Sequence, residues 1–365
     1  MSSPAGSELE GRDASRCRLE IIDFLRGIAI IEMLAAHYVG YLPPLIGKIV
    51  DYTETAMALF VLLAGFMVGW GYRKFERKPR EQTLILWQRG LRVLAVQYII
   101  IVTVGVPLYL LAIPGVRGDQ SLTVFILQSV TFSNQIGLIH ILPTFIPLFA
   151  LAPAILWAFS KGQTLTGLLA SVVVFCIGHF HPYVLDLGQP TIFPFVLFQL
   201  YFVIGCLVGK HAQITGTLTP EQPRRWFWIS IALLLTTMLL VHGKVLPSRL
   251  VSIHPLNLLG LMYHVPIIMT VCFSTIVFWP SIQRLSLYPF IARFGRHALL
   301  VFVIHVYLAK LLGVMNYLAL VPMLLNCVLI AASVAVISET VKLYERSLAR
   351  ARVPIWAQWV HVLFR

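Results

Sequence analysis

Ten long apolar segments are the feature that most constrains the fold of this 365-residue chain. Each is close to the length of about 20 residues that an α-helix needs to cross the roughly 30 Å hydrocarbon core of a bilayer. The segments lie at about 20–41, 54–72, 86–112, 138–160, 165–181, 192–210, 226–243, 257–279, 294–314 and 319–344. Backbone groups in lipid must be hydrogen-bonded within the protein, and separate apolar segments achieve this as helices. The sequence therefore predicts an all-α, polytopic transmembrane bundle of about ten spans.

The composition excludes an ordinary soluble protein. Hydrophobic residues make up 58% of the chain and charged residues only 12%, whereas charged residues make up about 25% of a soluble domain. The net charge of +13 would suggest nucleic acid as a partner of a soluble protein. In a membrane protein, basic loops set the topology. We therefore expect the lipid bilayer as the partner, and no nucleic acid.

The distribution of Lys and Arg predicts the orientation. If the N-terminus is cytoplasmic, the large majority of the 28 Lys and Arg residues fall in the cytoplasmic connections. The outer connections hold Lys48, Arg117, Lys244 and Arg249. Basic residues accumulate on the cytoplasmic side of membrane proteins. The pattern therefore predicts a multi-pass protein with both termini in the cytoplasm.

Three regions follow from this organisation. Residues 1–18 are polar and are expected to form a disordered cytoplasmic tail. Residues 19–345 form the transmembrane domain, and residues 346–365 a basic cytoplasmic tail. The longest outer connection contains LTVFILQSVTF at 122–132, which is expected to form a short interfacial or re-entrant helix.

The first apolar segment carries four ionisable residues, Asp23, Arg26, Glu32 and His37. Such groups are costly at membrane depth and mark functional sites. Arg26 and His37 are eleven residues apart, which on a helix places them on one face and about 16 Å apart along the axis. Asp23 lies one turn before Arg26 and is expected to pair with it. Glu32 lies off this face, and it either orders another helix or lines the acceptor side.

Two interpretations apply to each residue on the shared face. His37 can act as a general base that takes a proton from a hydroxyl, or it can hydrogen-bond a neighbouring helix. Arg26 can bind an anionic or carbonyl group that enters from the cytoplasm, or it can extend to the interface beside Asp23. Because both residues lie on one helix face, we favour the functional interpretation over the structural one for His37 and Arg26.

Two further arginines open the third segment. Arg89 and Arg92 are one helical turn apart at the predicted cytoplasmic surface. Paired guanidinium groups suit phosphate because they donate bidentate hydrogen bonds and keep their charge. The alternative is that these arginines only set the topology.

Other candidate residues carry weaker signals. Two histidines in or beside the spans, His140 and His305, are candidates for contact with a substrate. The histidine spacing contains no H-x-x-x-H or H-E-x-x-H arrangement with a third ligand, so no metal site is expected. Gly65 and Gly69 form a G-x-x-x-G pattern, which predicts a close approach between two helices.

The ordered set of these motifs resembles the integral-membrane acyltransferase family 3. The first segment contains D-F-L-R-G-I-A and an R-x10-H pattern formed by Arg26 and His37. The resemblance continues through TAMALFVLLAGFMVGWGYRK, WQRGLRVLAVQY and FGRHALLVFVIHVYL. Within that family, the stretches FVLLAGFMVGWGYR, SNQIGLIHILPTFIPLFALAP and GQPTIFPFVLFQLYFVIGCLVG look most like the branch that succinylates osmoregulated periplasmic glucans. Where the family usually has L-S-G, this chain has Leu63-Ala64-Gly65 and lacks the hydroxyl.

The resemblance implies transfer of an acyl group, with succinyl or acetyl as candidates, from cytoplasmic acyl-CoA to a hydroxyl of a periplasmic glucan or other carbohydrate. It implies a bacterial inner-membrane location. By the same resemblance, His37 is the catalytic base and Arg26, beside Asp23, its partner. Arg89 and Arg92 would contact the CoA phosphates, and Arg73 would add to that basic surface.

A proton-coupled transporter of an anionic or sugar substrate is the alternative. It would use the same intramembrane Arg and His as a relay. The sequence shows no internal repeat, which disfavours many transporter architectures.

Overall fold

The computed structural model describes residues 4–41, 47, 55–113, 120–132, 141–181, 195–215, 221–242, 258–318, 323–349 and 354–364, with side chains from Glu20 onward. These residues contain helices and no β-strand, which confirms the all-α prediction. The elements are α1 (Pro4–Tyr38), η1 (Val39–Tyr41), α3 (Ala56–Trp70), α4 (Tyr72–Arg77), α5 (Pro79–Ile100), η2 (Ile101–Gly105), α6 (Val106–Leu110), α7 (Leu122–Val130), α8 (Ile141–Ser160), α9 (Thr164–Phe180), α10 (Phe195–Thr215), α11 (Glu221–His242), α12 (Leu258–Val277), α13 (Trp279–Ile282), α14 (Tyr288–Arg296), α15 (Ala298–Tyr317), α16 (Met323–Leu348) and α17 (Ile355–Phe364).

Each of the ten predicted segments contains a helix of the structure. Within the described residues, seven helices are long and apolar enough to cross a membrane, and the longest of them joins α5, η2 and α6 over Pro79–Leu110. Two further apolar helices, α3 and α9, are shorter. The number of ten spans and the orientation of the termini stay predictions, as does disorder of residues 1–18. The short helix expected at 122–132 is present as α7.

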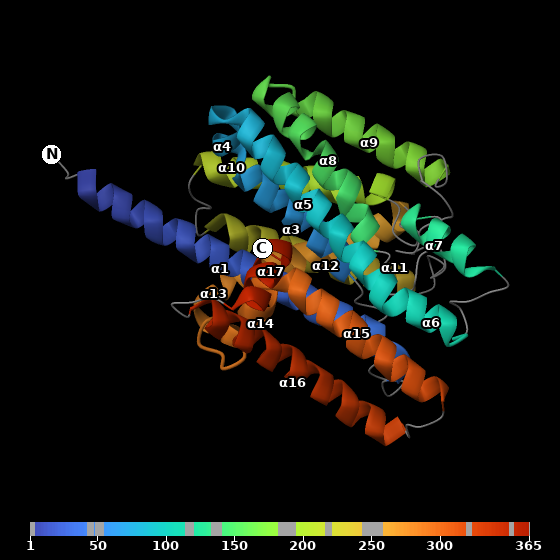
Figure 1. Ribbon diagram of the computed structural model, residues 1–365. Helices are drawn as coiled ribbons and strands as arrows, with labels where there is room; N and C mark the ends of the chain where they lie inside the picture. The colour runs from blue at the N-terminus through green and yellow to red at the C-terminus, as the bar shows by residue number, and fades with distance from the viewer. Residues whose placement is uncertain are drawn as a thin grey trace.

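The bundle is organised around α1, which packs against α3, α12, α14 and α15. Figure 1 shows α9 and α16 at opposite edges of the bundle, with α3, α5 and α15 between them. Apolar side chains on the outer surface are exposed, among them Leu165 on α9 and Leu239 on α11. This pattern is typical of a helical bundle in a membrane, because an exposed leucine there contacts lipid tails that are as apolar as its own side chain.

Glycines set the closest helix contacts. A Cβ atom added to Gly65 or Gly69 on α3 would lie 2.1 or 1.9 Å from a backbone oxygen of α10, so only glycine fits at either position. The same is true of Gly205 and Gly209 on α10, which face α3. The predicted close approach at Gly65 and Gly69 is therefore confirmed, and its partner is a second G-x-x-x-G pattern.

A second close contact joins α1 to α14. A Cβ atom on Gly27 would lie 2.0 Å from the carbonyl oxygen of Ile291, and one on Gly295 would lie 1.7 Å from that of Asp23. The helical chain breaks at His297, one residue before α15 begins. Residues 294–314, predicted as one segment, are therefore divided between α14 and α15, and this break directs the end of α14 toward α1.

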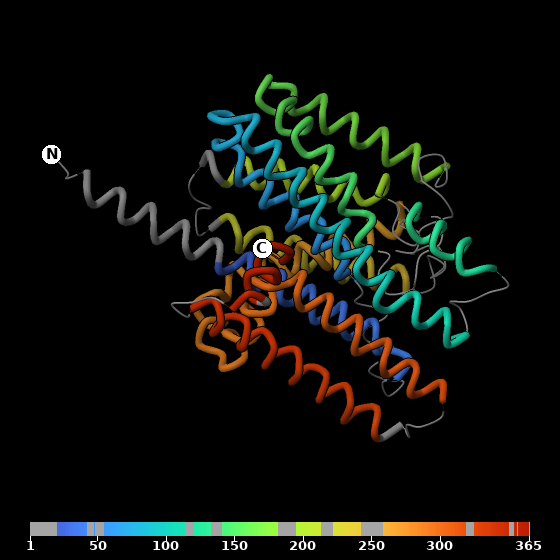
Figure 2. The backbone as a smooth tube through the Cα atoms, in the orientation of Figure 1, coloured from blue at the N-terminus to red at the C-terminus, as the bar shows by residue number. Residues whose placement is uncertain are grey.

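The end of the chain returns to the bundle. The C-terminal helix α17 lies within the region predicted as a basic tail, and it packs against α5 and α16. The tube in Figure 2 shows the described C-terminal residues lying across the bundle. This position matters for the cavity described next.

Candidate active site

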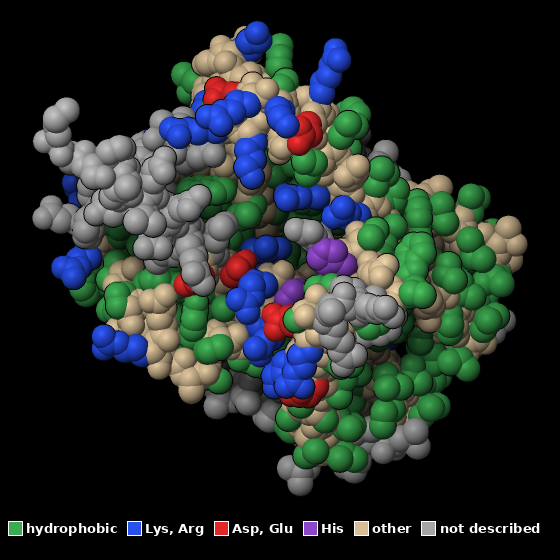
Figure 3. Space-filling view, turned by 60° about the vertical axis from the view of Figure 1, so that its left-hand side comes forward, with side chains coloured by type: hydrophobic (Ala, Val, Ile, Leu, Met, Phe, Trp, Pro, Cys, Tyr) green, Lys and Arg blue, Asp and Glu red, His purple; other side chains and the backbone are tan. Residues whose placement is uncertain are grey.

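Four arginines line one cavity of about 230 Å³ within the bundle. They are Arg26 on α1, Arg89 and Arg92 on α5, and Arg296 on α14. No Asp or Glu is among the described residues that line this space, which we call the arginine cavity. Figure 3 shows Lys and Arg side chains gathered on one face of the molecule. A cavity with four positive charges and no acid on its wall is suited to an anion with several negative charges.

Local sequence explains how the arginines meet. Arg26 precedes Gly27 and Arg296 follows Gly295, so the glycine contact between α1 and α14 brings both guanidinium groups to one place. Arg89 and Arg92 share a helix face because they are three residues apart. The structure thus brings together the predicted Arg26, Arg89 and Arg92, and it adds Arg296, which the sequence analysis counted only as a cytoplasmic charge.

The guanidinium of Arg26 interacts with the charge of Asp23 at longer range, and it also contacts an aromatic ring. Its carbon atom lies 5.8 Å from the centre of the Phe60 ring, a cation–π contact. No ion pair within 4.0 Å forms between Arg26 and Asp23, although both residues are described. Asp23 also does not line the cavity. Because Arg26 lines the cavity and Asp23 does not, the guanidinium can contact a ligand bound there.

Apolar side chains line much of the rest of the cavity. Met33 on α1 and Phe302 on α15 are two of these residues, and both are buried. Leu363 and Phe364 of α17 also line the cavity. The C-terminal helix therefore forms part of the wall, which the sequence analysis did not predict.

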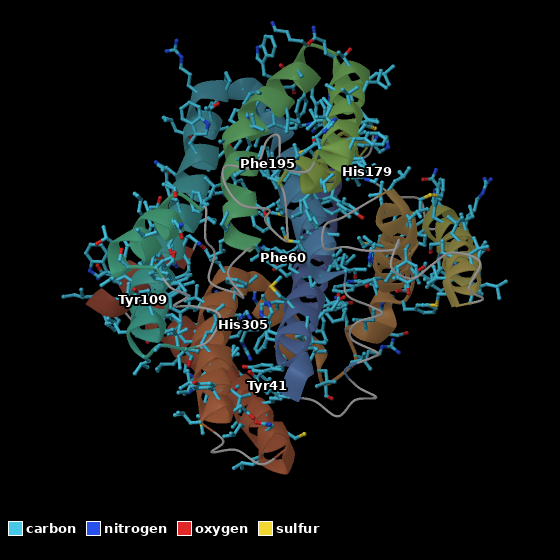
Figure 4. The ribbon with its side chains drawn as sticks, turned by 90° about the vertical axis from the view of Figure 1, so that its right-hand side faces the viewer. Tyr41, Phe60, Tyr109, His179, Phe195 and His305 are labelled. Atoms are coloured by element: carbon cyan, nitrogen blue, oxygen red, sulfur yellow. The ribbon has the colours of Figure 1, made fainter. Side chains whose placement is uncertain are left out.

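A pair of histidines lies beyond Met33 and Phe302. The Nδ1 atom of His37 is 2.6 Å from the Nε2 atom of His305. The two rings stack with their centres 4.8 Å apart, and the ring of Phe302 meets His305 edge-on at 5.1 Å. Figure 4 shows His305 in the interior of the bundle, between Phe60 and Tyr41. Neither histidine lines the arginine cavity.

The histidine pair can hold and release one proton. His305 is fully buried, and its Nδ1 atom has no hydrogen-bond partner among the described residues. If Nδ1 of His37 donates to Nε2 of His305, then Nε2 of His37 carries a lone pair and can accept a proton. A buried, unsatisfied ring nitrogen of this kind is typical of a functional site. The two histidines are 268 residues apart in sequence, so spacing gave no signal of their contact.

Glu32 orders another helix. Its Oε1 atom accepts a hydrogen bond of 2.5 Å from the backbone N–H of Thr55, directly before α3, and the Thr55 hydroxyl lies 3.3 Å from both carboxylate oxygens. A carboxylate at a helix N-terminus satisfies free N–H groups and the helix dipole. This contact supports the first of the two roles considered for Glu32.

The remaining predicted residues lie elsewhere. Arg73 is exposed on α4 and does not line the arginine cavity. His140 falls outside the described residues. In the described part of the chain, no three His, Cys, Asp or Glu side chains come together as a metal site.

A carboxylate on α16 holds the α14–α15 junction. Glu345 accepts from Nε of Arg293 at 2.9 Å and contacts Nε2 of His297 at 3.0 Å. Burial lowers the pKa of His297, against the opposing effect of Glu345. The segment F-G-R-H contains Gly295, which contacts α1, and also Arg296 and His297, which lie near Glu345. This group was missed because Glu345 belongs to a distant helix.

Comparison with known proteins identifies the family. The profile described as OpgC protein matches residues 18–348, which include every predicted segment and end before α17. Neither a curated protein nor a solved structure shows significant similarity to the chain. Because the match covers most of the sequence, this chain belongs to the OpgC protein family, and the membership implies a membrane enzyme of the acyltransferase type.

Proposed function

We propose that this protein transfers a succinyl group from cytoplasmic succinyl-CoA to a hydroxyl of an osmoregulated periplasmic glucan, in the bacterial inner membrane. One observation carries the proposal. The arginine cavity, which suits a polyanion, ends next to a buried histidine pair that can take up a proton. Family membership supports the acyltransferase reaction.

The arginine cavity is the proposed donor site. The CoA diphosphate binds Arg89 and Arg92, which donate bidentate hydrogen bonds from one face of α5. The acyl end extends along α1 toward Arg26. A succinyl group ends in a carboxylate, and Arg26 is a cation that lines the cavity beside the apolar side chains of Ile30 and Phe60. An acetyl group offers no such charge, so Arg26 favours succinyl.

His37 is the proposed base. Its Nε2 atom takes the proton of the acceptor hydroxyl while the oxygen attacks the thioester carbonyl. The C–O bond forms, the C–S bond breaks, and His37 returns the proton to the leaving thiolate of CoA. During the step, the protonated His37 donates from Nδ1 to His305, which stabilises the charge. His305 therefore positions and supports His37 without touching the substrate.

The donor must pass Met33 and Phe302 to reach the base. Met33 and His37 are four residues apart, which corresponds to about 6 Å along a helix. A shift of these two side chains connects the cavity with the histidine pair. Closure in the absence of donor keeps the two sides of the membrane apart.

Mass spectrometry of periplasmic glucans tests the reaction. Cells that produce the wild-type protein should carry glucans heavier by succinyl groups. A His37→Ala variant should lower this substitution about 10²- to 10⁴-fold, the usual contribution of a general base. His179→Ala, on the edge helix α9, is the matched control and should behave as wild type. Unchanged succinylation in the His37→Ala strain, at equal protein level, excludes His37 as the base.

The donor is tested with purified protein. Succinyl-CoA should be consumed with a higher kcat/KM than acetyl-CoA, and each turnover should release one free thiol. Substrate uptake into vesicles without consumption of acyl-CoA would instead support the transporter.

A further inference from the structure

Arg296 is the arginine of the cavity to which the sequence analysis gave no role of its own. It lies at the end of α14, on a different helix from Arg89 and Arg92, and lines the same space. The glycine contact at Gly27 and Gly295 fixes the backbone that carries it. Its position is therefore set by the fold, and its side chain is 48% exposed.

The nearby carboxylate of Glu345 forms an ion pair with Arg296 but no hydrogen bond. The two oxygens of Glu345 already engage Arg293 at 2.9 Å and His297 at 3.0 Å, whereas Arg296 is 3.7 Å away, beyond hydrogen-bond distance. Arg296 can therefore turn toward a ligand in the cavity without breaking a hydrogen bond to Glu345.

The charge of the donor calls for a further cation. CoA carries a diphosphate and, on the ribose, a separate monophosphate ester with a charge of about −1.5 to −2 at neutral pH. Arg89 and Arg92 together balance the two charges of the diphosphate. The ribose phosphate is several bonds away from the diphosphate and needs its own ligand on another wall of the site.

We propose that Arg296 binds the ribose 3′-phosphate of the donor and thereby distinguishes CoA from 3′-dephospho-CoA. This assignment rests on the proposed function, because it takes CoA as the donor. On binding, Arg296 turns from Glu345 toward the phosphate, while Arg293 and His297 keep the carboxylate and the α14–α15 junction in place.

Calorimetric titration of the purified full-length protein with CoA and with 3′-dephospho-CoA tests the assignment. Arg296→Gln should weaken CoA binding about tenfold to a hundredfold, the effect expected for loss of a charge-assisted hydrogen bond. The same variant should bind 3′-dephospho-CoA as the wild type does. Arg284→Gln, an exposed arginine near α13 that does not line the cavity, is the matched control and should leave both affinities unchanged.

The outcomes separate the two proposals. If the wild type binds neither ligand, the proposed function fails. If Arg89→Gln weakens CoA binding and Arg296→Gln does not, only the role of Arg296 is overturned. Equal losses for CoA and 3′-dephospho-CoA in Arg296→Gln also overturn it, because they show an effect unrelated to the 3′-phosphate.

Discussion

The arginine cavity and the histidine pair lie at neighbouring levels of α1, yet their charges are satisfied in opposite ways. The cavity holds four guanidinium groups and no acid on its described wall. In the histidine pair, each ring has the other as its partner at 2.6 Å. The cavity therefore needs a ligand to balance its charge, whereas the two rings of the pair bond each other. This difference suggests that binding and chemistry are divided between two levels, with Met33 and Phe302 between them.

Neutralising the cavity should have the largest effect. We expect the double variant Arg89→Gln, Arg92→Gln to raise KM for acyl-CoA at least about 100-fold, because each arginine loses a charge-assisted bond worth about 1.5–3 kcal/mol. The kcat at saturating donor should change little. Steady-state kinetics at several salt concentrations measures this, and the salt dependence of KM should weaken. The double variant Arg77→Gln, Arg80→Gln, with arginines outside the cavity, is the control. If the double variant lowers only kcat, the cavity does not serve mainly to bind the donor, and the proposed separation of binding from chemistry is wrong.

The histidine pair should show the reverse pattern. We expect His305→Leu to lower kcat about 10- to 100-fold, within the range of general-base effects, and to leave KM for the donor unchanged. His305→Gln should recover part of the rate, because its amide oxygen can accept the hydrogen bond from Nδ1 of His37. Measuring kcat and KM at equal concentrations of folded protein separates this catalytic effect from a loss of folded enzyme. Equal rates for Leu and Gln would show that the hydrogen bond is unimportant.

The glycine contact between α1 and α14 should affect both stability and the cavity. A methyl group at Gly295 would meet the carbonyl oxygen of Asp23 at 1.7 Å. We expect Gly295→Ala to lower the free energy of unfolding by about 1–3 kcal/mol, the cost of overpacking, and to weaken CoA binding by moving Arg296. Thermal unfolding in detergent and titration with CoA measure the two effects.

Gly167→Ala on α9 is the control for this contact, because its new methyl group would lie 3.6 Å from the nearest atom, an ordinary distance. It should be neutral or slightly stabilising, since alanine favours a helix more than glycine does. If Gly295→Ala melts like Gly167→Ala, the α1–α14 contact is not as close as described.

The smallest effect is expected at Glu32. Because its carboxylate accepts from the N–H of Thr55, Glu32→Ala should cost about 1 kcal/mol of stability, as loss of a helix cap does. Glu32→Gln keeps an acceptor oxygen and should cost less. Thermal unfolding compares the two variants. A raised KM for the glucan in Glu32→Gln, at unchanged stability, would instead favour a role on the acceptor side.

Sequence reasoning predicted the features that depend on one helix. The apolar segments, the shared face of Arg26 and His37 and the spacing of Arg89 and Arg92 follow from helical periodicity alone. The same reasoning was less informative where a residue depends on a neighbouring helix. It placed Asp23 beside Arg26, and the two charges interact without a contact within 4.0 Å; the role of Arg73 at the donor site stays a prediction, since Arg73 does not line the cavity.

By itself, then, the sequence determined that this protein is a helical membrane bundle with a basic end and an ionisable first helix. Only the tertiary structure decided which charges meet. The contact of His37 with His305, the place of Arg296 beside Arg26 and the capping of α3 by Glu32 all join different helices. Helical periodicity fixes angles and rises within a helix, but glycine contacts such as Gly27 with Ile291 set the distances between helices. The site forms between helices, so its composition follows from how they pack.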